Sequence, residues 1–508
     1  MAAKFQYPFQ RIQFFEPQAP AQRILVAAAG PKLYCYAAES GRRLSVWPQD
    51  QETANGQDSD IAEKSTGADG QEPPGKKRKL SPSADGSSSD PKPNTKETGK
   101  SQASSSWSHI SLLATSPTGN HIVAVTPEDK CIRVFEVGKD GTLQHISERH
   151  MPKRPSVISL TPDGNTIICG DKFGDVYSLP LIPSDKPIVQ AKPSTPKLFQ
   201  PAATNLTVHT KRNLEALEQQ LRVGSKSAEE RAPQFEHKLL LGHVSMLSAL
   251  TYVSLPSPSS AGQSRSYLLT GDRDEHIRVS RGIPQTHVIE NYCFGHTSFI
   301  TQMCIPDWRP ELLVSGGGDD HLLVWKWQEG RILQKVPLLD DKSESREIAV
   351  RGIWALSLPA SGNAVKVVFV AAEGSPELLC YTMESDGQLR RQPSIQLTSN
   401  VLDVAYDGEN NSILVSLDGV HESGSTQAFK ENPTAPQSFL QALRVVEGRD
   451  DLTFEAVEDS LVSSVNAEGT TDVVTSDDEK AIEKSKKDLT DALYGLGNLR
   501  KRANGEEE

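Results

Sequence analysis

The chain of 508 residues lacks the features of membrane, disulfide-bonded and zinc-binding proteins. No segment approaches the roughly 20 consecutive apolar residues that span a bilayer, and no long apolar stretch follows basic residues near the N-terminus. The six cysteines are scattered without a C-x-x-C pair, and most lie in apolar runs such as TIIC at 166–169. We therefore expect free, buried thiols in a soluble protein of a reducing compartment.

Sequence patterns that carry catalysis or cofactor binding are also missing. The run GGG at 316–318 lacks the Lys-Ser/Thr of a phosphate loop and leads into a strand, so no helix N-terminus would face an anion. No nucleophile elbow, zincin or deaminase spacing occurs, and the histidines are not clustered at metal-ligand separations. We expect no catalytic residue, no bound cofactor and no metal in this chain.

Basic charge is scarce outside short patches. The formal net charge is −12, and residues 447–508 alone contain seventeen Asp/Glu and eight Lys/Arg, which leaves the remainder close to neutral. Nucleic-acid affinity rests largely on Lys and Arg that neutralise phosphates. A nearly neutral body predicts that any RNA is held by local basic patches or by another subunit.

Three segments bury too little apolar surface to offset the entropy of the chain. These are two inserts of low order at 50–105 and 182–236 and a mostly acidic tail at 445–508. The remaining segments, 1–49, 106–181 and 237–444, total 333 residues, which is enough for one large core.

The tail contains one predicted helix. Ser476-Asp477-Asp478-Glu479 is a capping-box pattern that predicts its start. Leu489, Leu493 and Leu496 then form one narrow apolar stripe on an otherwise polar helix. Such a helix docks either on the rest of the chain or on a partner, and the pattern leaves both open.

Two stretches match residue for residue and predict neighbouring repeats. They are LLTGDRDEHIRVS at 268–280 and LVSGGGDDHLLVW at 313–325, preceded by Gly-His at 242–243 and 295–296. In each stretch a strand ends in Thr or Ser, Asp follows four residues later, and a second strand ends six residues beyond. Gly-His before the first strand and Trp at the end of the third are typical of the blades of a WD-repeat β-propeller.

The residue types at these positions suit a buried hydrogen-bonded chain that joins the strands of one blade. We expect the chain to consist of His296, Ser315, Asp319 and Trp325 in one blade and of His243, Thr270 and Asp274 in the other, where Ser280 replaces Trp. Buried polar groups are stable only when all are paired. These residues are therefore expected to maintain the fold rather than to catalyse a reaction.

Less regular copies of the repeat occupy the rest of the foldable sequence. They lie at 24–36, 122–135, 166–177, 365–381 and 401–417. At about 40–45 residues for each blade, the available length allows seven to eight blades. We expect an all-β propeller of seven blades.

A run of four basic residues lies in the first insert. Lys76, Lys77, Arg78 and Lys79 stand among Pro, Ser and Gly and are followed by Leu-Ser-Pro. Consecutive basic residues on a flexible loop suit the acidic groove of a nuclear import receptor. The alternative is a solvated charge run, and we favour an import signal and a nuclear protein.

Several motifs are more specific than a generic WD repeat. They are HMPKRPS at 150–156, TPDG at 161–164, GDKFGDV at 170–176, LGHVSML at 241–247 and GDRDEHIRVS at 271–280, with FGH at 294–296 and the run at 316–327. Over about residues 150–330 the chain resembles the WD-repeat non-catalytic subunit of tRNA (guanine-N7)-methyltransferase. Ser280 in the Trp position is typical of that family, and the long inserts resemble those of filamentous-fungal members.

The resemblance implies a heterodimer. A separate Rossmann-like subunit carries S-adenosylmethionine and methylates N7 of a guanine in the tRNA variable loop, and this chain stabilises and orients that subunit. Transfer RNA is then bound mainly through the partner. The alternative function is a WD-repeat scaffold of a ubiquitin ligase or of a ribosome-assembly complex.

One hairpin is a candidate surface for that partner. Five charged or titratable residues lie between Leu269 and Ser280 beyond the expected Asp274: Asp272, Arg273, Glu275, His276 and Arg278. Arg278 is expected to point away from the face of Ile277 and Val279 and to reach outward. Local pairing of these charges is the alternative, but the family resemblance favours an interface that also includes Lys153 and Arg154 on a neighbouring blade.

Overall fold

The computed structural model describes most of the chain outside the first two predicted inserts. The described residues are 5–16, 22–49, 108–117, 120–184, 214, 235–256, 264–339, 347–359, 364–430, 438–447, 452–471, 473–474 and 479–501. Met1–Trp47 and Ser108–Glu508 form one compact unit, and Pro48–Trp107 form another. Nearly all of the insert at 50–105, with its basic run, and nearly all of the insert at 182–236 lie outside the described residues.

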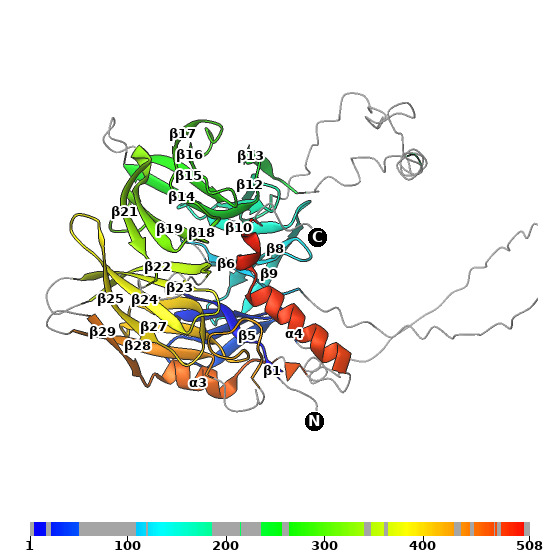
Figure 1. The fold of residues 1–508 in the computed structure, drawn as a ribbon. Coiled ribbons are helices and arrows are strands. Elements are labelled where there is room, and N and C mark those ends of the chain that lie inside the picture. Colours follow the sequence, from blue (N-terminus) through cyan, green and yellow to red (C-terminus); the bar gives the residue numbers. More distant parts are fainter. Residues whose placement is uncertain are drawn as a thin grey trace, which may run out of the picture. The chain divides into compact units, whose positions relative to one another are not determined.

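Seven four-stranded antiparallel sheets make up the first unit, and each sheet consists of consecutive strands (Figure 1). We number them as blades 1 to 7 in chain order. The first three blades contain β2 (Phe9–Phe15), β3 (Ile24–Ala29), β4 (Lys32–Ala37) and β5 (Arg43–Trp47); β6 (Leu112–Thr115), β7 (His121–Thr126), β8 (Cys131–Val137) and β9 (Leu143–His150); and β10 (Pro155–Leu160), β11 (Thr166–Asp171), β12 (Asp175–Pro180) and β13 (Lys238–Gly242).

Blades 4 to 7 repeat this arrangement. They contain β14 (Leu247–Pro256), β15 (Ser264–Asp272), β16 (Ile277–Arg281) and β17 (Ile289–Cys293); β18 (Ile300–Cys304), β19 (Leu312–Gly317), β20 (His321–Lys326) and β21 (Arg331–Pro337); β22 (Val350–Leu358), β23 (Val365–Ala372), β24 (Glu377–Met383) and β25 (Leu389–Gln396); and β26 (Asn400–Asp407), β27 (Ser412–Asp418), β28 (Leu440–Glu447) and β29 (Leu452–Val457). The predicted seven-bladed β-propeller is confirmed.

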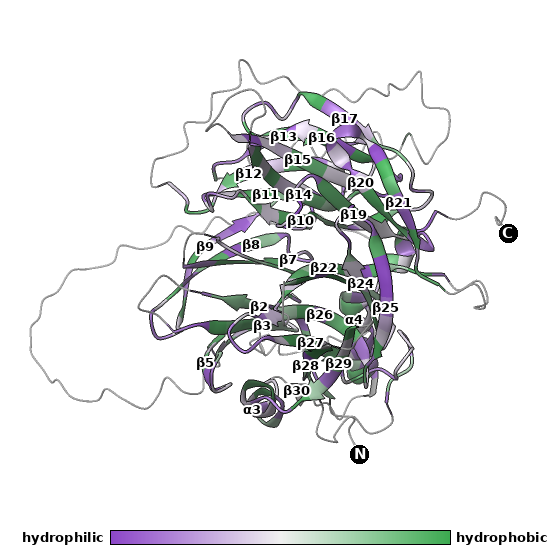
Figure 2. Ribbon diagram, turned by 90° about the vertical axis from the view of Figure 1, so that its left-hand side faces the viewer, coloured by the Kyte–Doolittle hydropathy of each residue, from purple (hydrophilic) through white to green (hydrophobic). Residues whose placement is uncertain are grey.

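The hydrophobic core lies between the blades. Strands in the middle of a blade are buried on both faces, as in β3 with the sequence ILVAAA, whereas the fourth strands mix exposed and buried residues, as in β25. Figure 2 shows the same contrast, with green along β19 and a purple stretch in β25. Side chains of neighbouring blades share one cluster: Leu269 and Val279 of blade 4 pack with Leu313 and Trp325 of blade 5.

The first strands of neighbouring blades contact one another around the centre of the ring. In blades 1, 3, 4, 5 and 6 the pairing of the first strand shifts by one residue, and the extra residue is polar. Its side chain donates a hydrogen bond to a backbone carbonyl of the next blade. The bonds run from Gln10 to Ile110, Ser156 to Leu247, Ser248 to Ile300, Thr301 to Val350 and Arg351 to Leu402.

Blade 7 departs from this pattern at the point where the ring closes. Its extra residue is Leu402, which has no side-chain donor. The boundary with blade 1 is bridged instead by the N–H of Ile12, which donates to the carboxylate of Asp403 at 2.9 Å, and by the hydroxyl of Ser416, which donates to the Phe9 carbonyl. Within the described residues, no blade takes a strand from the opposite end of the chain.

The last blade and the segment after it extend far into the predicted acidic tail, so the predicted boundary at residue 445 is wrong. β28 runs to Glu447, and β29 pairs with it along Leu452–Val457. The segment continues with α3 (Ser460–Glu468), the short strand β30 (Val473–Val474), α4 (Glu479–Leu493) and the 3-10 helix η3 (Leu496–Leu499). High acidic content obscured apolar positions such as Leu461 and Val465, which are buried in α3.

The predicted polar helix is present as α4, and it packs on the propeller. Leu489 and Leu493 are buried, as the apolar stripe predicts, and Leu496 begins η3. None of the helices in the described segments has the length and apolar character needed to cross a bilayer. All six cysteines are free, and five are buried.

The polar chain of blade 5 is formed as predicted. His296 hydrogen-bonds through Nδ1 to Asp319 at 2.7 Å and through Nε2 to the hydroxyl of Ser315 at 2.7 Å. The indole N–H of Trp325 donates to the same hydroxyl at 2.8 Å. Burial alone would raise the pKa of Asp319, but hydrogen bonds from His296 and Thr297 outweigh it and hold this pKa below its usual value.

In blade 4 the carboxylate comes from a different residue than predicted. His243 bonds to Thr270 at 2.7 Å and to Asp272 at 3.1 Å, so the assignment of Asp274 to this chain is wrong. Asp272 ends β15 and also accepts the backbone N–H groups of Asp274 and His276. In blade 5 the position equivalent to Asp272 is Gly317. A Cβ at Gly317 would lie 1.8 Å from the Phe299 carbonyl oxygen, so the carboxylate of blade 5 comes from a later residue, Asp319.

Replacing Asp319 with Ala should lower the free energy of unfolding by about 1–3 kcal/mol, because the buried ring of His296 loses its carboxylate partner. Thermal and urea unfolding of the full-length chain measure this change. The control is Asp320→Ala, because the Asp320 side chain is 75% exposed and its pair with His321 is worth about 0–1 kcal/mol. An Asp319→Ala protein as stable as the control would contradict the role of the polar chain.

Candidate partner-binding site

Several of the predicted partner-binding residues lie in β16 and in the loops of blades 3 and 4, close to exposed apolar side chains. We call this region the blade 3–4 surface and define it by Lys153, Phe173, Val244, His276, Arg278 and Phe294.

Arg278 is half-buried rather than directed freely into solvent. Its Nε donates to the hydroxyl of Ser280 at 2.9 Å, and Nη1 lies 3.4 Å from the carbonyl of Gly242 in blade 3. Among the described residues no carboxylate forms an ion pair with its guanidinium. Burial lowers the pKa of Arg278 from its usual value, so this cation has lost part of its hydration without gaining an anionic partner.

The replacement of Trp by Ser explains how an arginine is accommodated there. Ser280 is paired with Leu268, as Trp325 is paired with Leu313 in blade 5. Arg278 therefore occupies the register position of Leu323, a residue that is buried in blade 5. The small hydroxyl of Ser280 supplies a polar partner for the arginine. In blade 5 the indole of Trp325 occupies the equivalent position.

Aromatic side chains border Arg278 on the side of blade 5. Tyr292 pairs with Arg278 across β16 and β17, and its ring stacks on Phe294 with centroids 5.3 Å apart. His276 meets the edge of Phe294 at 5.5 Å. Phe294 is 60% exposed, which leaves an apolar ring open to solvent beside a half-buried cation.

The opposite border is formed by blade 3 and its loops. The ammonium group of Lys153 lies 4.2 Å from the centre of the Phe173 ring, and this ring is 61% exposed. Val244, next to His243, is fully exposed. Arg154, the other basic residue predicted here, forms an ion pair with Glu128 at 3.0 Å on the surface.

Three predicted partner-binding residues have other contacts. Asp272 is buried in the polar chain of blade 4, so its assignment to a partner surface is wrong. Arg273 donates through Nε to the carbonyl of Leu499 at 2.7 Å, and Glu275 pairs with Lys501 at 3.0 Å. The hairpin is thus occupied on one side by the chain's own C-terminal segment, and Arg278 and His276 lie on the other side.

Phe173, Val244 and Phe294 were not predicted as part of the surface. Each stands beside Gly or His of a turn, as in KFG at 172–174, HVS at 243–245 and FGH at 294–296. An apolar residue in a turn between strands is the signal that could have identified them, because turns face solvent.

A cluster on blade 2 has the donor types of a metal site. Ligand atoms of Cys131, Glu148 and His150 lie within 4.8 Å of one another. The Glu148 carboxylate already pairs with Arg133 at 3.2 Å and with His150 at 3.1 Å, and burial raises the pKa of the Cys131 thiol to about 12. Since a thiol binds metal as the thiolate, the ion pairs account for this cluster without a metal.

Known proteins are similar in sequence to this chain over its full length. The family described as "tRNA methyltransferase TRM82 WD40 domain" matches residues 25–443. The tRNA (guanine-N(7)-)-methyltransferase non-catalytic subunit trm82 of Aspergillus clavatus is 52% identical, with 100% of both chains covered. The corresponding subunit of Coccidioides immitis is 44% identical, with 99% of both chains covered.

Solved structures have a lower sequence identity to this chain. The structure of U3-55K covers 89% of this chain and 96% of its own at 13% identity, with a TM-score of 0.47. The full-length similarity to the fungal subunits decides between the two functions left open by the sequence, because it matches the methyltransferase subunit. The chain belongs to the TRM82 family of WD40-repeat, non-catalytic subunits of tRNA (guanine-N7)-methyltransferase.

Proposed function

We propose that this chain forms a heterodimer with the catalytic methyltransferase subunit through the blade 3–4 surface, and that it stabilises and orients that subunit. The observation that carries the proposal is Arg278, a half-buried guanidinium without a carboxylate partner among the described residues. Exposed Phe294 stacks on Tyr292, which pairs with Arg278, and exposed Val244 lies two residues after Gly242, whose carbonyl accepts from Arg278. A cation surrounded by exposed apolar groups is typical of the centre of a protein–protein interface.

The chemistry of this surface specifies what the partner presents. The planar fork of an arginine can bind a carboxylate through two parallel hydrogen bonds, which a lysine cannot do. Apolar partner groups that cover Phe294 and Val244 would exclude water and strengthen this ion pair. We expect an Asp or Glu of the catalytic subunit, surrounded by apolar side chains, opposite Arg278.

Transfer RNA is expected to reach this chain mainly through the partner. The blade 3–4 surface offers Lys153, whose ammonium group lies on Phe173, and Arg154, whose charge is paired with Glu128. Two such residues neutralise few phosphates, and nucleic-acid affinity grows with the number neutralised. The catalytic subunit is then the principal tRNA-binding element, and this chain sets its position.

Arg278→Leu should reduce recovery of the catalytic subunit on co-purification and lower N7-methylguanosine in tRNA. Loss of one member of a buried ion pair at an interface commonly costs about 2–5 kcal/mol. The matched control is Arg281→Leu on the same strand, since Arg281 already pairs with Glu290 within the chain. Both variants should melt like the unmodified protein, and normal partner recovery by folded Arg278→Leu would reject this site.

The purified chain alone should neither bind S-adenosylmethionine nor transfer its methyl group. The physical reason is that the blades present strand-to-strand turns, whereas dinucleotide-like cofactors are held at a Gly-rich turn that opens a helix. Isothermal titration calorimetry of the chain, with the co-purified pair as positive control, measures this. Micromolar binding of the cofactor by the chain alone would contradict the proposal.

We further propose a nuclear location that depends on Lys76–Lys79. These residues lie outside the described residues. Replacing all four with Ala should shift a fluorescently tagged protein from the nucleus to the cytoplasm, with no change in its melting curve. The experiment uses cells without the catalytic subunit, so that the partner cannot carry the variant in, and unchanged nuclear signal would exclude this run as the necessary one.

A further inference from the structure

Residues 479–501, the C-terminal segment, contact blades 7, 6 and 4 and the residues that precede blade 6. The segment consists of α4, η3 and the two basic residues that follow, and it is drawn in red in Figure 1. Five contacts along its length trace this path. They join Leu489 to blade 7, Leu493 and Gly495 to blade 6, Arg500 to the residues before blade 6 and Lys501 to blade 4.

The apolar part of the segment packs where the ring closes. Leu489, Leu493 and Tyr494 form one buried cluster with Leu402, the extra residue in the first strand of blade 7. The same cluster contains Phe5 of β1 (Phe5–Gln6), which precedes blade 1. β1 pairs with β30 just upstream of α4, so both ends of the chain meet at this boundary.

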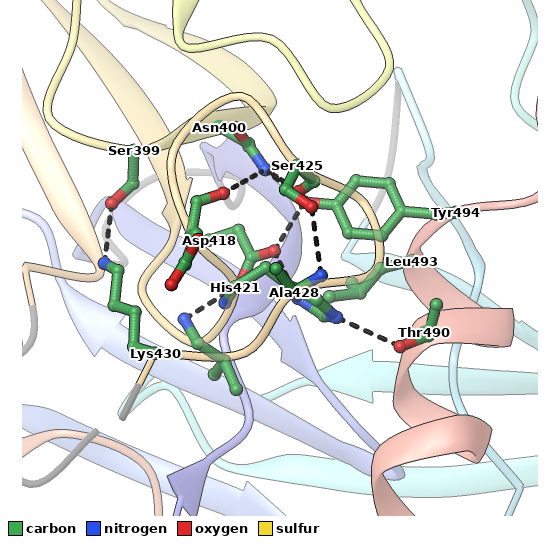
Figure 3. A network of polar contacts seen from close by, with 12 residues as sticks. Ser399, Asn400, Asp418, His421, Ser425, Ala428, Lys430, Thr490, Leu493 and Tyr494 are labelled. Atoms are coloured by element: carbon green, nitrogen blue, oxygen red, sulfur yellow. Dashed lines mark hydrogen bonds and ion pairs between the residues drawn. The ribbon is translucent and has the colours of Figure 1, made fainter. Parts of the chain in front are cut away.

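A buried polar network joins α4 to blade 7 (Figure 3). His421 bonds to the Asp418 carboxylate at 2.7 Å and to the hydroxyl of Thr490 at 3.0 Å. Tyr494 donates to the same carboxylate at 2.5 Å and accepts a hydrogen bond from the amide of Asn400 at 3.1 Å. Asp418 ends the second strand of its blade, as Asp272 does in blade 4, but in blade 7 α4 supplies part of the polar chain.

Two charged groups of blade 6 hold the junction between α4 and η3. Arg351 is buried and donates both to the carbonyl of Leu402 and to that of Leu493, at the end of α4. Glu373 accepts the backbone N–H groups of Gly495, Leu496 and Gly497 at 2.7, 3.0 and 3.2 Å. A cation at the C-terminus of one helix and an anion at the start of the next both suit the helix dipole.

Two features are missing between blades 7 and 1. No strand is shared across this boundary within the described residues, and Leu402 cannot donate the side-chain hydrogen bond found at five other boundaries. We propose that the C-terminal segment is the closing device of the propeller: it locks blade 7 to blade 6 and to the N-terminal strand, in place of a shared strand.

Hydrogen exchange of the full-length chain, followed by mass spectrometry, tests this role. Glu373→Gln weakens the anchor of η3 without touching blade 7, and Tyr494→Phe removes one bond to Asp418. Both should accelerate exchange in β2 and in β26–β27 by about tenfold, the effect of losing roughly one charge-assisted hydrogen bond, while β11 of blade 3 stays unchanged. The control, Lys487→Ala on the exposed side of α4, should match the unmodified protein.

The proposal is overturned if exchange accelerates only within residues 479–501, because the segment would then be a surface helix that the ring does not need. Equal acceleration in β11 would also overturn it, since the effect would be a general loss of stability. If Tyr494→Phe fails to fold, Glu373→Gln decides, because Glu373 lies in the loop after β23, outside the buried network.

Discussion

Side-chain hydrogen bonds from bulged first strands join five pairs of neighbouring blades around the centre of this propeller. A residue that is extra to the ladder is not paired with a residue of the neighbouring strand, and its side chain can reach the neighbouring blade. Ser248 and Thr301 donate in this way to the backbone carbonyls of Ile300 and Val350. The bond fixes the spacing of two blades, and the apolar clusters then fill the space between their faces.

The proposed binding surface contains a departure from the blade 5 pattern within one blade. Blade 5 has the complete set of His296, Ser315, Asp319 and Trp325, and its inner face is closed by apolar neighbours. Blade 4 has the corresponding His243 and the hydroxyl of Thr270, but Ser280 takes the position of the indole. Arg278 donates a hydrogen bond to Ser280. The polar chain that is complete in blade 5 is therefore incomplete in blade 4, where Arg278 is half-buried.

The C-terminal segment extends from the ring boundary at blade 7 to the hairpin of blade 4. It begins beside the boundary between blades 7 and 1 and ends on the hairpin of blade 4, where Lys501 pairs with Glu275. This contact uses the acidic side of the hairpin and leaves Arg278 on the side of Gly242. The proposed partner surface on blades 3 and 4 therefore lies next to residues that the C-terminal segment already contacts.

The sequence by itself determined the propeller, its seven blades and the polar chain of blade 5, because these follow from local spacing: strand, turn and strand repeat within a few dozen residues. The family also followed from contiguous motifs between 150 and 330. Only the tertiary structure decided that Asp272 rather than Asp274 meets His243, that Arg273 and Glu275 are engaged by residues 499 and 501, and that the acidic C-terminal region completes the last blade. The reason is that each of these contacts joins residues far apart in the chain or depends on the path of a turn, and one-dimensional spacing contains neither.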